Sequence, residues 1–334
     1  MERIHMKTFI RCVAKLTAAL ILLIAAGPFL LVASDWPEQE FAAAGETLMF
    51  HRTDLGATSV ELETWTAPDG SDLSLRRYPT ENPNAPLMVM VHGSGMHSGQ
   101  FEQLATTLAA EGVANVLVPA LRGHGTSPER RGDVDYVGQL EDDLASLIEA
   151  EAGPSQEAIL LGHSSGGGLV VRFAGGAHGA MLDRAILLAP YLGHDAPTTH
   201  PNAGGWAHPL LRRYIGLEIL NGFGVTALNG LTVVQLNLPD ALRADADAGP
   251  MTDAYSYRLN TSYHPRPELG ADISNLPETL LIAGADDEAF VANLYQPTME
   301  VFTSLGTYHV LPDLQHMDVV DAQSTAALIV DWLR

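Results

Sequence analysis

From residue 60 onward, the chain alternates short apolar runs with segments of helical periodicity. Runs as continuous as these are typical of strands buried on both faces of a parallel sheet. The predicted strands are residues 87–91, 114–119, 158–161, 184–189, 279–283 and 307–311. Apolar positions recur at helical spacing in residues 98–111, 136–151, 165–174, 289–304 and 319–333. This alternation predicts an α/β protein with a mostly parallel, doubly wound sheet.

The sheet is expected to open with a hairpin. Residues 60–66 and 71–78 alternate apolar and polar positions, and Pro68, Asp69 and Gly70 lie between them. Such a triplet favours a tight turn that joins two antiparallel strands.

One connection between predicted strands is much longer than the others. Residues 194–278 separate two core strands and contain many apolar and aromatic positions. Because long insertions in compact domains are usually functional lids, we expect a cap subdomain inserted into one domain at residues 35–334. The alternative is a side subdomain that only packs against the core.

The N-terminal segment has the pattern of membrane targeting. Residues 16–33 are almost entirely apolar and follow Arg3, Lys7, Arg11 and Lys15. This run is longer than a signal-peptide core of roughly 7 to 15 residues and approaches the ~20 residues that span a bilayer. Residues 1–34 are therefore predicted to be an uncleaved anchor with the catalytic domain outside the cytoplasm. A cleaved signal peptide, which would give a secreted or periplasmic protein, is the alternative.

The charge of the chain disfavours nucleic acid as a partner. From residue 35 onward there are 14 Arg and no Lys against 39 acidic residues, and the whole chain has a net charge of −22. Phosphate backbones repel such a surface.

The only cysteine, Cys12, precedes the globular part, so no disulfide framework or cysteine metal site is expected there.

A candidate nucleophile lies where a predicted strand passes into a helix. Residues 158–168 read AILLGHSSGGG, a GxSxG turn centred on Ser164. A serine on a sharp strand-to-helix elbow needs small neighbours, and Gly162 and Gly166 supply them. Centring the motif on Ser165 would instead put His163 at a position without room for a side chain.

A serine nucleophile needs a general base, and a carboxylate to orient that base. In a doubly wound sheet both should follow later strands, in the order Ser, acid, His. The strand at 279–283 is followed by three candidate acids, Asp286, Asp287 and Glu288.

The base is expected on the loop after the last strand. His316 lies there, whereas His309 falls inside the strand and would be held away from the loop. Asp318 is interpreted as a charge at a helix N-terminus, where the helix dipole favours it.

The tetrahedral oxyanion needs backbone N–H donors. The strand at 87–91 runs into His92-Gly93-Ser94-Gly95, and we assign the oxyanion hole to the amides of Ser94 and Ser165. His92, His124 and His163 are interpreted as structural.

Cofactor chemistry is not expected. No histidine and carboxylate group has metal-ligand spacing, and neither a GxGxxG motif nor a phosphate loop is present. The sequence gives no indication of an oligomeric state.

Together these motifs resemble the α/β-hydrolase superfamily and its monoacylglycerol lipase and lysophospholipase-like branch, often grouped with the serine aminopeptidase S33 domain. The resemblance implies the α/β-hydrolase fold with Ser164 as nucleophile, Asp287 as the acid of a GxxD motif, His316 as base, and Ser94 and Ser165 as oxyanion residues. Residues 194–278 match the variable cap of the family. The resembling stretches are residues 91–109, 118–148, 160–168, 280–290 and 311–318.

The leading hypothesis is a serine hydrolase that cleaves carboxylic esters such as monoacylglycerols or lysophospholipids through an acyl-enzyme on Ser164. A peptidase or aminopeptidase-type hydrolase is the first alternative, with cap acids as the amine site; these acids are Asp240, Asp245, Asp247 and Asp253. A non-catalytic binding module is the second. Because the candidate triad lies on core loops, the cap is expected to govern substrate choice more than the chemistry.

Overall fold

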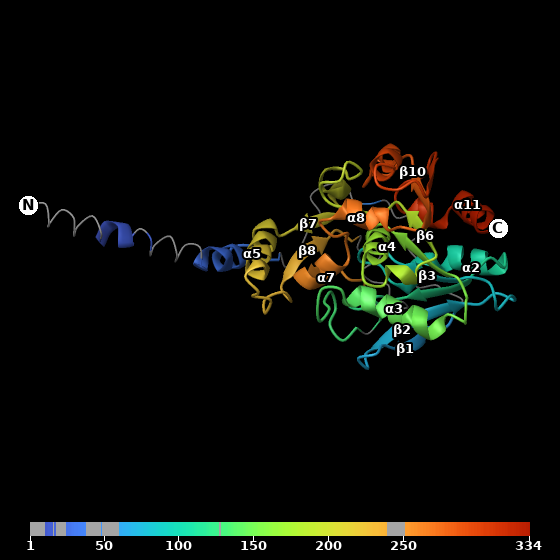
Figure 1. The fold of residues 1–334 in the computed structure, drawn as a ribbon, viewed down its shortest axis with the longest axis horizontal. Coiled ribbons are helices and arrows are strands. Elements are labelled where there is room, and N and C mark those ends of the chain that lie inside the picture. Colours follow the sequence, from blue (N-terminus) through green and yellow to red (C-terminus); the bar gives the residue numbers. More distant parts are fainter. Residues whose placement is uncertain are drawn as a thin grey trace, which may run out of the picture.

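The computed structural model describes residues 11–15, 17, 25–37, 48, 60–126, 128–238 and 251–334. Its centre is an eight-stranded sheet with the order β1-β2-β4-β3-β5-β6-β10-β11 (Figure 1). The first two pairings, β1 with β2 and β2 with β4, are antiparallel, and all the others are parallel. The strands are β1 Glu63–Thr66, β2 Asp72–Tyr78, β3 Leu87–Val91, β4 Asn115–Pro119, β5 Ala158–His163, β6 Arg184–Leu188, β10 Glu278–Gly284 and β11 Gly306–Leu311.

This sheet confirms the predicted mostly parallel, doubly wound architecture. Every residue of β3 and of β5 is buried, as their continuous apolar sequences predict. The edge strand β11 differs, because each of its residues is half-buried or exposed, and Val310 is 41% exposed. It has a neighbour on one side only, so the predicted burial on both faces is wrong for this strand.

Helices pack on the sheet in two groups. On one side α2 contacts α10 and α11, while α4, which follows the central strand β5, packs against α8. The helix α3 also contacts the central sheet. The bounds are α2 Glu102–Ala110, α3 Gln139–Glu151, α4 Ser165–Gly175, α8 Leu269–Ser274, α9 Tyr295–Met299, α10 Asp318–Asp321 and α11 Gln323–Leu333, with short 3-10 turns at Ser98–Phe101, Gly179–Met181 and Ala292–Leu294.

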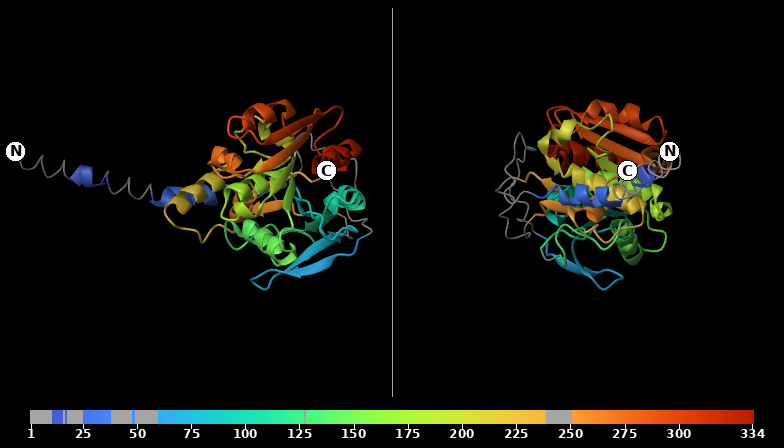
Figure 2. Two further views of the ribbon diagram at one scale, coloured as in Figure 1. Left: turned by 45° about the vertical axis from the view of Figure 1, so that its right-hand side comes forward. Right: turned by 90° about the vertical axis from the view of Figure 1, so that its left-hand side faces the viewer.

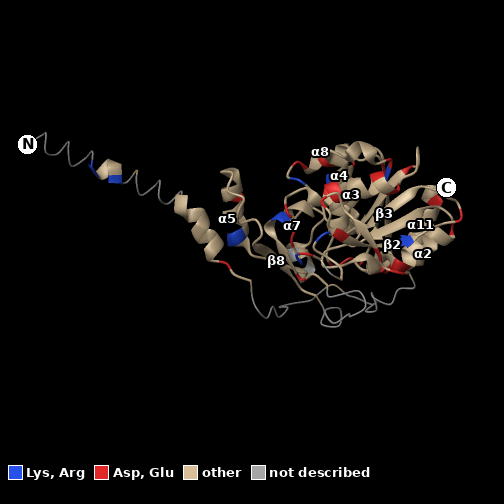
Figure 3. Ribbon diagram, turned by 90° about the horizontal axis from the view of Figure 1, so that it is seen from below, with Lys and Arg blue, Asp and Glu red and all other residues tan. Residues whose placement is uncertain are grey.

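The long connection between β6 and β10 contains a second, smaller sheet with the order β7-β8-β9 (Figures 1 and 2). This cap is built from a 3-10 turn at Pro201–Gly205, β7 Ala207–Pro209, α5 Leu211–Gly222, β8 Thr232–Leu236, β9 Ala254–Ser256 and α7 Tyr257–Ser262. Its helix α7 contacts α3, whereas α8 at the end of the connection belongs to the layer beside α4. Acidic residues occur at many places along the ribbon of the body of the molecule (Figure 3).

The N-terminal helical residues 25–33 lie against α5 of the cap (Figure 1). Val32 is buried there, and Gly216 of α5 approaches so closely that an added Cβ would lie 2.8 Å from a Val32 methyl. Of the anchor predicted at residues 1–34, residues 1–10, 16 and 18–24 lie outside the described residues. Within the described part of the chain, no helix combines the length and the apolar character needed to cross a membrane.

Candidate functional site

The predicted nucleophile Ser164 lies at the junction of β5 and α4. Its backbone has φ 54° and ψ −121°, in a region that residues other than glycine rarely occupy. Neighbouring backbones leave no room for side chains on either flank. A Cβ on Gly162 would lie 2.3 Å from the Gly166 carbonyl oxygen, and a Cβ on Gly166 would lie 2.2 Å from the Val91 carbonyl oxygen. The sharp elbow therefore depends on both glycines.

Asp287 and His316 meet on the loops that follow β10 and β11. The Nδ1 of His316 lies 2.9 Å from Oδ2 of Asp287, and both side chains are buried. The other carboxylate oxygen of Asp287 accepts hydrogen bonds from the amides of Ala289 and Phe290, each at 2.8 Å. The carboxylate is thereby fixed in orientation, and the ring of His316 is held through Nδ1 with Nε2 on its far side.

The pair also sets the protonation of the histidine. Burial acts to lower the pKa of His316, but the charge of Asp287 and the hydrogen bond to it outweigh burial and raise that pKa above 6.5. An imidazolium is therefore stabilised at this position, as a general base requires once it has taken a proton.

The alternative residues from the sequence lie elsewhere. Asp286 is exposed, while Glu288 accepts a hydrogen bond from the His316 amide at 3.0 Å. His309 lies within β11, and Asp318 opens α10 and accepts from the Gln315 amide at 3.1 Å. Of the three candidate acids, Asp287 is thus the one whose carboxylate contacts the His316 ring.

The two predicted oxyanion residues lie side by side. The hydroxyl oxygens of Ser94 and Ser165 are 2.5 Å apart, and both residues are partly exposed although their neighbours are buried. A Cβ on Gly93 would lie 3.3 Å from Cβ of Ser164, so the loop at residues 92–95 directly adjoins the elbow. Both amides thus belong to the same small region as Ser164.

A hydrogen-bond chain that the sequence did not predict links this loop to His316. Gln100 accepts from the Gly93 amide at 2.8 Å and donates from Nε2 to Nδ1 of His163 at 2.9 Å. With Nδ1 accepting, His163 donates from Nε2 to the His316 carbonyl at 3.1 Å. Burial and then the charge of His316 lower the pKa of His163 well below 6.5, so the ring is neutral.

His163 therefore links Gln100 to the loop that carries His316. This structural role agrees with the interpretation of His163 from the sequence. Its ring centroid lies 4.6 Å from that of His316. Two cap tyrosines, Tyr255 and Tyr263, also contact the loop at residues 92–95, and nothing in their local sequence singles them out. Neither hydrophobic periodicity nor a sequence motif predicts contacts between segments so far apart in the sequence.

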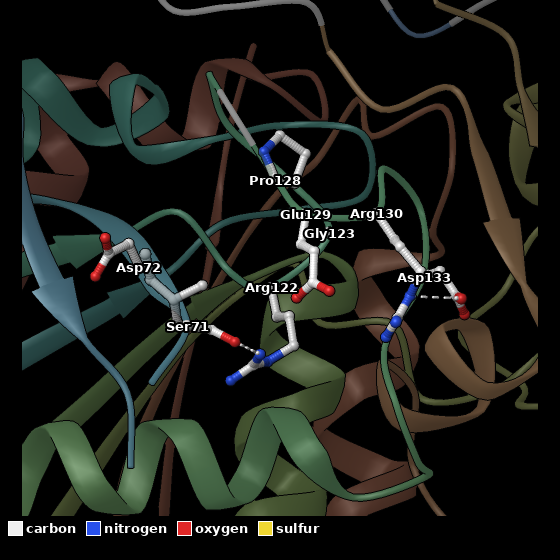
Figure 4. Close-up of a pocket in the computed structure, with 9 residues that line it drawn as sticks. Ser71, Asp72, Arg122, Gly123, Pro128, Glu129, Arg130 and Asp133 are labelled. Atoms are coloured by element: carbon white, nitrogen blue, oxygen red, sulfur yellow. Dashed lines mark hydrogen bonds and ion pairs between the residues drawn. The ribbon is translucent and has the colours of Figure 1, made fainter. Parts of the chain in front are cut away.

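A cavity of about 280 Å³ lies at a different place in the molecule (Figure 4). Most of its lining residues are polar or charged. Arg122 donates to Ser71 and to Asp143, and Arg130 pairs with Asp133. None of the predicted site residues lines it. This cavity is therefore separate from the candidate active site.

Comparison with known proteins gives matches along the body of the chain. Residues 82–229 match the family described as serine aminopeptidase, S33. A monoacylglycerol lipase of Mycolicibacterium smegmatis is 32% identical over 127 residues, which cover 37% of this chain. The matched segment spans 39% of that relative and smaller shares of other curated relatives.

Solved structures share the fold. A soluble variant of monoglyceride lipase from Saccharomyces cerevisiae superimposes with a TM-score of 0.62 at 17% identity, over 85% of this chain and 96% of that one. A membrane phospholipase A described as a bacterial virulence factor gives a TM-score of 0.57 at 19% identity, over 98% of this chain and 99% of that one.

The sheet order, the strained elbow and these solved structures together show the α/β-hydrolase fold. The sequence similarities lie with the serine aminopeptidase S33 family, over less than half of this chain, and with a monoacylglycerol lipase, over part of its length. The resemblance seen in the sequence is confirmed at this level.

Proposed function

We propose that the protein is a serine hydrolase of carboxylic esters, with Ser164 as nucleophile, His316 as general base and Asp287 as the orienting acid. The observation that carries this proposal is the buried Asp287 to His316 hydrogen bond of 2.9 Å, on loops beside the elbow. His163, the residue that precedes Ser164, packs against the His316 ring at 4.6 Å. This arrangement supports the assignment of the three residues to the roles of a catalytic triad.

In the first half of the reaction, Oγ of Ser164 bonds to the ester carbonyl carbon as its proton passes to Nε2 of His316. The negative charge on the former carbonyl oxygen is stabilised by the amides of Ser94 and Ser165. The carbon to alkoxide bond then breaks, and the alcohol leaves with the proton from His316. In the second half, water loses a proton to His316 as its oxygen bonds to the acyl carbon. The bond between that carbon and Oγ of Ser164 then breaks, His316 returns the proton to Oγ, and the carboxylic acid leaves.

The substrate we propose is a lipid-like ester such as a monoacylglycerol or a lysophospholipid. The similarity to a monoacylglycerol lipase supports this class. An amine-binding cap would instead favour aminoacyl substrates. Of the acids that would form such a site, Asp240, Asp245 and Asp247 lie outside the described residues, and Asp253 is exposed.

The proposal is tested with Ser164→Ala. We expect kcat on p-nitrophenyl esters to fall by about 10⁴-fold or more and labelling by a fluorophosphonate probe to disappear. Ser274→Ala, which removes a hydroxyl from the surface of α8, is the matched control and should keep both. Persistent labelling of the Ser164→Ala protein would contradict the assignment. Monoacylglycerols, lysophospholipids and aminoacyl amides assayed side by side then define the substrate class.

For localisation, we propose a membrane anchor at residues 16–33 with the hydrolase domain on the extracytoplasmic side. The basic residues before this segment support that orientation. A row of exposed apolar side chains on α5, four residues apart, supports contact of the cap with the lipid surface, because residues at this spacing share one helix face. The row consists of Leu211, Ile215, Ile219 and Phe223, and the adjoining helical residues Phe29 and Leu30 are exposed as well.

Fractionation tests the localisation. We expect the full-length protein to remain with membranes through a carbonate wash, whereas a chain that starts at Asp35 should be soluble and active on soluble esters. A native N-terminus near Ser34 or Asp35, found in the soluble extracytoplasmic fraction, would favour a cleaved signal peptide instead.

A further inference from the structure

Two tyrosine hydroxyls of the cap reach into the core and bond to the loop at residues 92–95. Tyr255 lies on β9 and Tyr263 follows α7, and each is only 2% exposed. The Tyr255 hydroxyl is 2.5 Å from the Gly95 amide, and the Tyr263 hydroxyl bonds the His92 carbonyl and lies 3.1 Å from that of Gly93. The cap therefore contacts the backbone of the loop itself.

The direction of the hydrogen bonds around Tyr255 follows from its neighbours. Nδ1 of His124 lies 3.1 Å from the Arg122 carbonyl, which can only accept, so Nδ1 carries the proton. Nε2 of His124 then accepts from the Tyr255 hydroxyl at 2.8 Å, and the tyrosine oxygen accepts from the Gly95 amide. Burial foremost, followed by the charge of His92, lowers the pKa of His124 well below 6.5, which keeps this tautomer neutral.

Tyr263 is fixed by a similar arrangement. Nε2 of His92 accepts from the Leu121 amide at 3.1 Å, so Nδ1 carries the proton and lies 2.9 Å from the Gly93 carbonyl. Burial lowers the pKa of His92 to about 4, and the ring stays neutral. The Tyr263 hydroxyl therefore donates to the backbone carbonyl of His92.

Among the amides of Gly93, Ser94 and Gly95, one donates no hydrogen bond within the described part of the chain. The Gly93 amide donates to Gln100 and the Gly95 amide to Tyr255. Between them, the Ser94 amide donates to no group in the described part of the chain, and Ser94 is the partly exposed residue of the loop. Gly95 has a φ of +75°, so the chain turns sharply just after Ser94. The bonds on either side hold the Ser94 amide in place.

We propose that Tyr255, supported by Tyr263, is a positioning residue for the oxyanion hole, so that the cap completes the catalytic site rather than only covering it. This proposal rests on the function proposed above. Oxyanion donors act because they are already oriented before charge develops, and removal of one donor costs about 10²- to 10³-fold in kcat. Loss of the Tyr255 hydroxyl leaves the Gly95 amide and His124 Nε2 buried without their partner, which frees the loop to shift.

The test compares Tyr255→Phe with Tyr257→Phe. Tyr257 is a cap tyrosine two residues away, and its hydroxyl donates to Glu218 at 2.9 Å instead of to the loop. We expect Tyr255→Phe to lower kcat on p-nitrophenyl acetate by about 10-fold or more per active site, with KM changed much less. Active sites are counted by complete fluorophosphonate labelling, which corrects for protein lost to misfolding. Tyr257→Phe should keep the wild-type kcat.

A transition-state analogue separates positioning from general loss of structure. Affinity for a trifluoromethyl ketone, whose serine adduct carries the oxyanion, should fall in parallel with kcat/KM in Tyr255→Phe. If Tyr255→Phe does not fold, Tyr263→Phe takes its place with the same expected direction.

Wild-type kcat and analogue affinity in labelled Tyr255→Phe protein would overturn the proposal while the function of Ser164 stands. A wild-type protein that neither hydrolyses esters nor is labelled at Ser164 would remove the proposed function and this proposal together.

Discussion

The two halves of the candidate site are held in different ways. The acid and base loops are fixed from within the hydrolase core, since Asp287 accepts two amides of its own loop and Glu288 holds the His316 amide. The loop at residues 92–95 is instead held between Gln100 of the core and Tyr255 of the cap. In the proposed mechanism, proton transfer therefore depends on local structure, whereas oxyanion stabilisation depends on Tyr255, which lies more than 150 residues from the loop in sequence.

The largest loss of activity should come from a substitution in the acid and base loops, the half of the candidate site that the core holds in place. Asp287→Asn is expected to lower kcat by about 10⁴-fold, because an amide cannot favour the reactive tautomer of His316 or stabilise its cation. Asp286→Asn is the matched control, since Asp286 is exposed and should tolerate the change. Steady-state assays of both variants decide the matter. A greater loss in Asp286→Asn would shift the acid by one residue.

Removal of the cap should disturb the other half of the candidate site, the loop at residues 92–95. The sequence alone predicts that a variant without residues 195–265 changes chain-length preference and retains activity on small esters. The contacts of Tyr255 and Tyr263 favour another outcome, a loss of about 10²-fold even on p-nitrophenyl acetate, as expected when one oxyanion donor is lost. The comparison requires circular dichroism to establish that the shortened chain is folded. Full activity on the acetate would mean that the oxyanion loop is stable without the cap.

Much of the core was predictable because local patterns determine it. The strand at 87–91 has the predicted bounds, and the elbow glycines could be predicted because the GxSxG motif needs small residues on both sides of a sharp turn. Helix ends were less predictable. The helix expected at 136–151 begins at Gln139, because Gly138 adopts φ 104° just before it. The helix expected at 289–304 contracts to a 3-10 turn and α9, where Pro297 fits the first turn of a short helix.

The cap contacts were not predictable in the same way. Tyr255 and Tyr263 belong to an aromatic-rich insertion in which no motif distinguishes them from Tyr257, whose hydroxyl contacts only the cap. Gln100 likewise lies in an ordinary amphipathic segment. Their contacts depend on how the cap packs on the core, and residue spacing does not predict that packing.

The smallest effect, a shift in the pH dependence of kcat/KM, distinguishes the two halves of the candidate site most directly. His316 must be neutral to accept the proton of Ser164, and Asp287 raises the pKa of His316 above 6.5. Activity should therefore be lost as the pH falls, with the acid limb of kcat/KM above 6.5 in the wild type, because kcat/KM follows ionisations of the free enzyme. Residual activity in Asp287→Asn should have its acid limb at lower pH, since the charge that stabilises the imidazolium is gone.

Tyr255→Phe should lower the plateau of kcat/KM and leave the acid limb in place, because no titrating group near His316 has changed. A moved limb in Tyr255→Phe would show that the cap also acts on the His316 pair, and the separation of the site into two independently held halves would then be wrong.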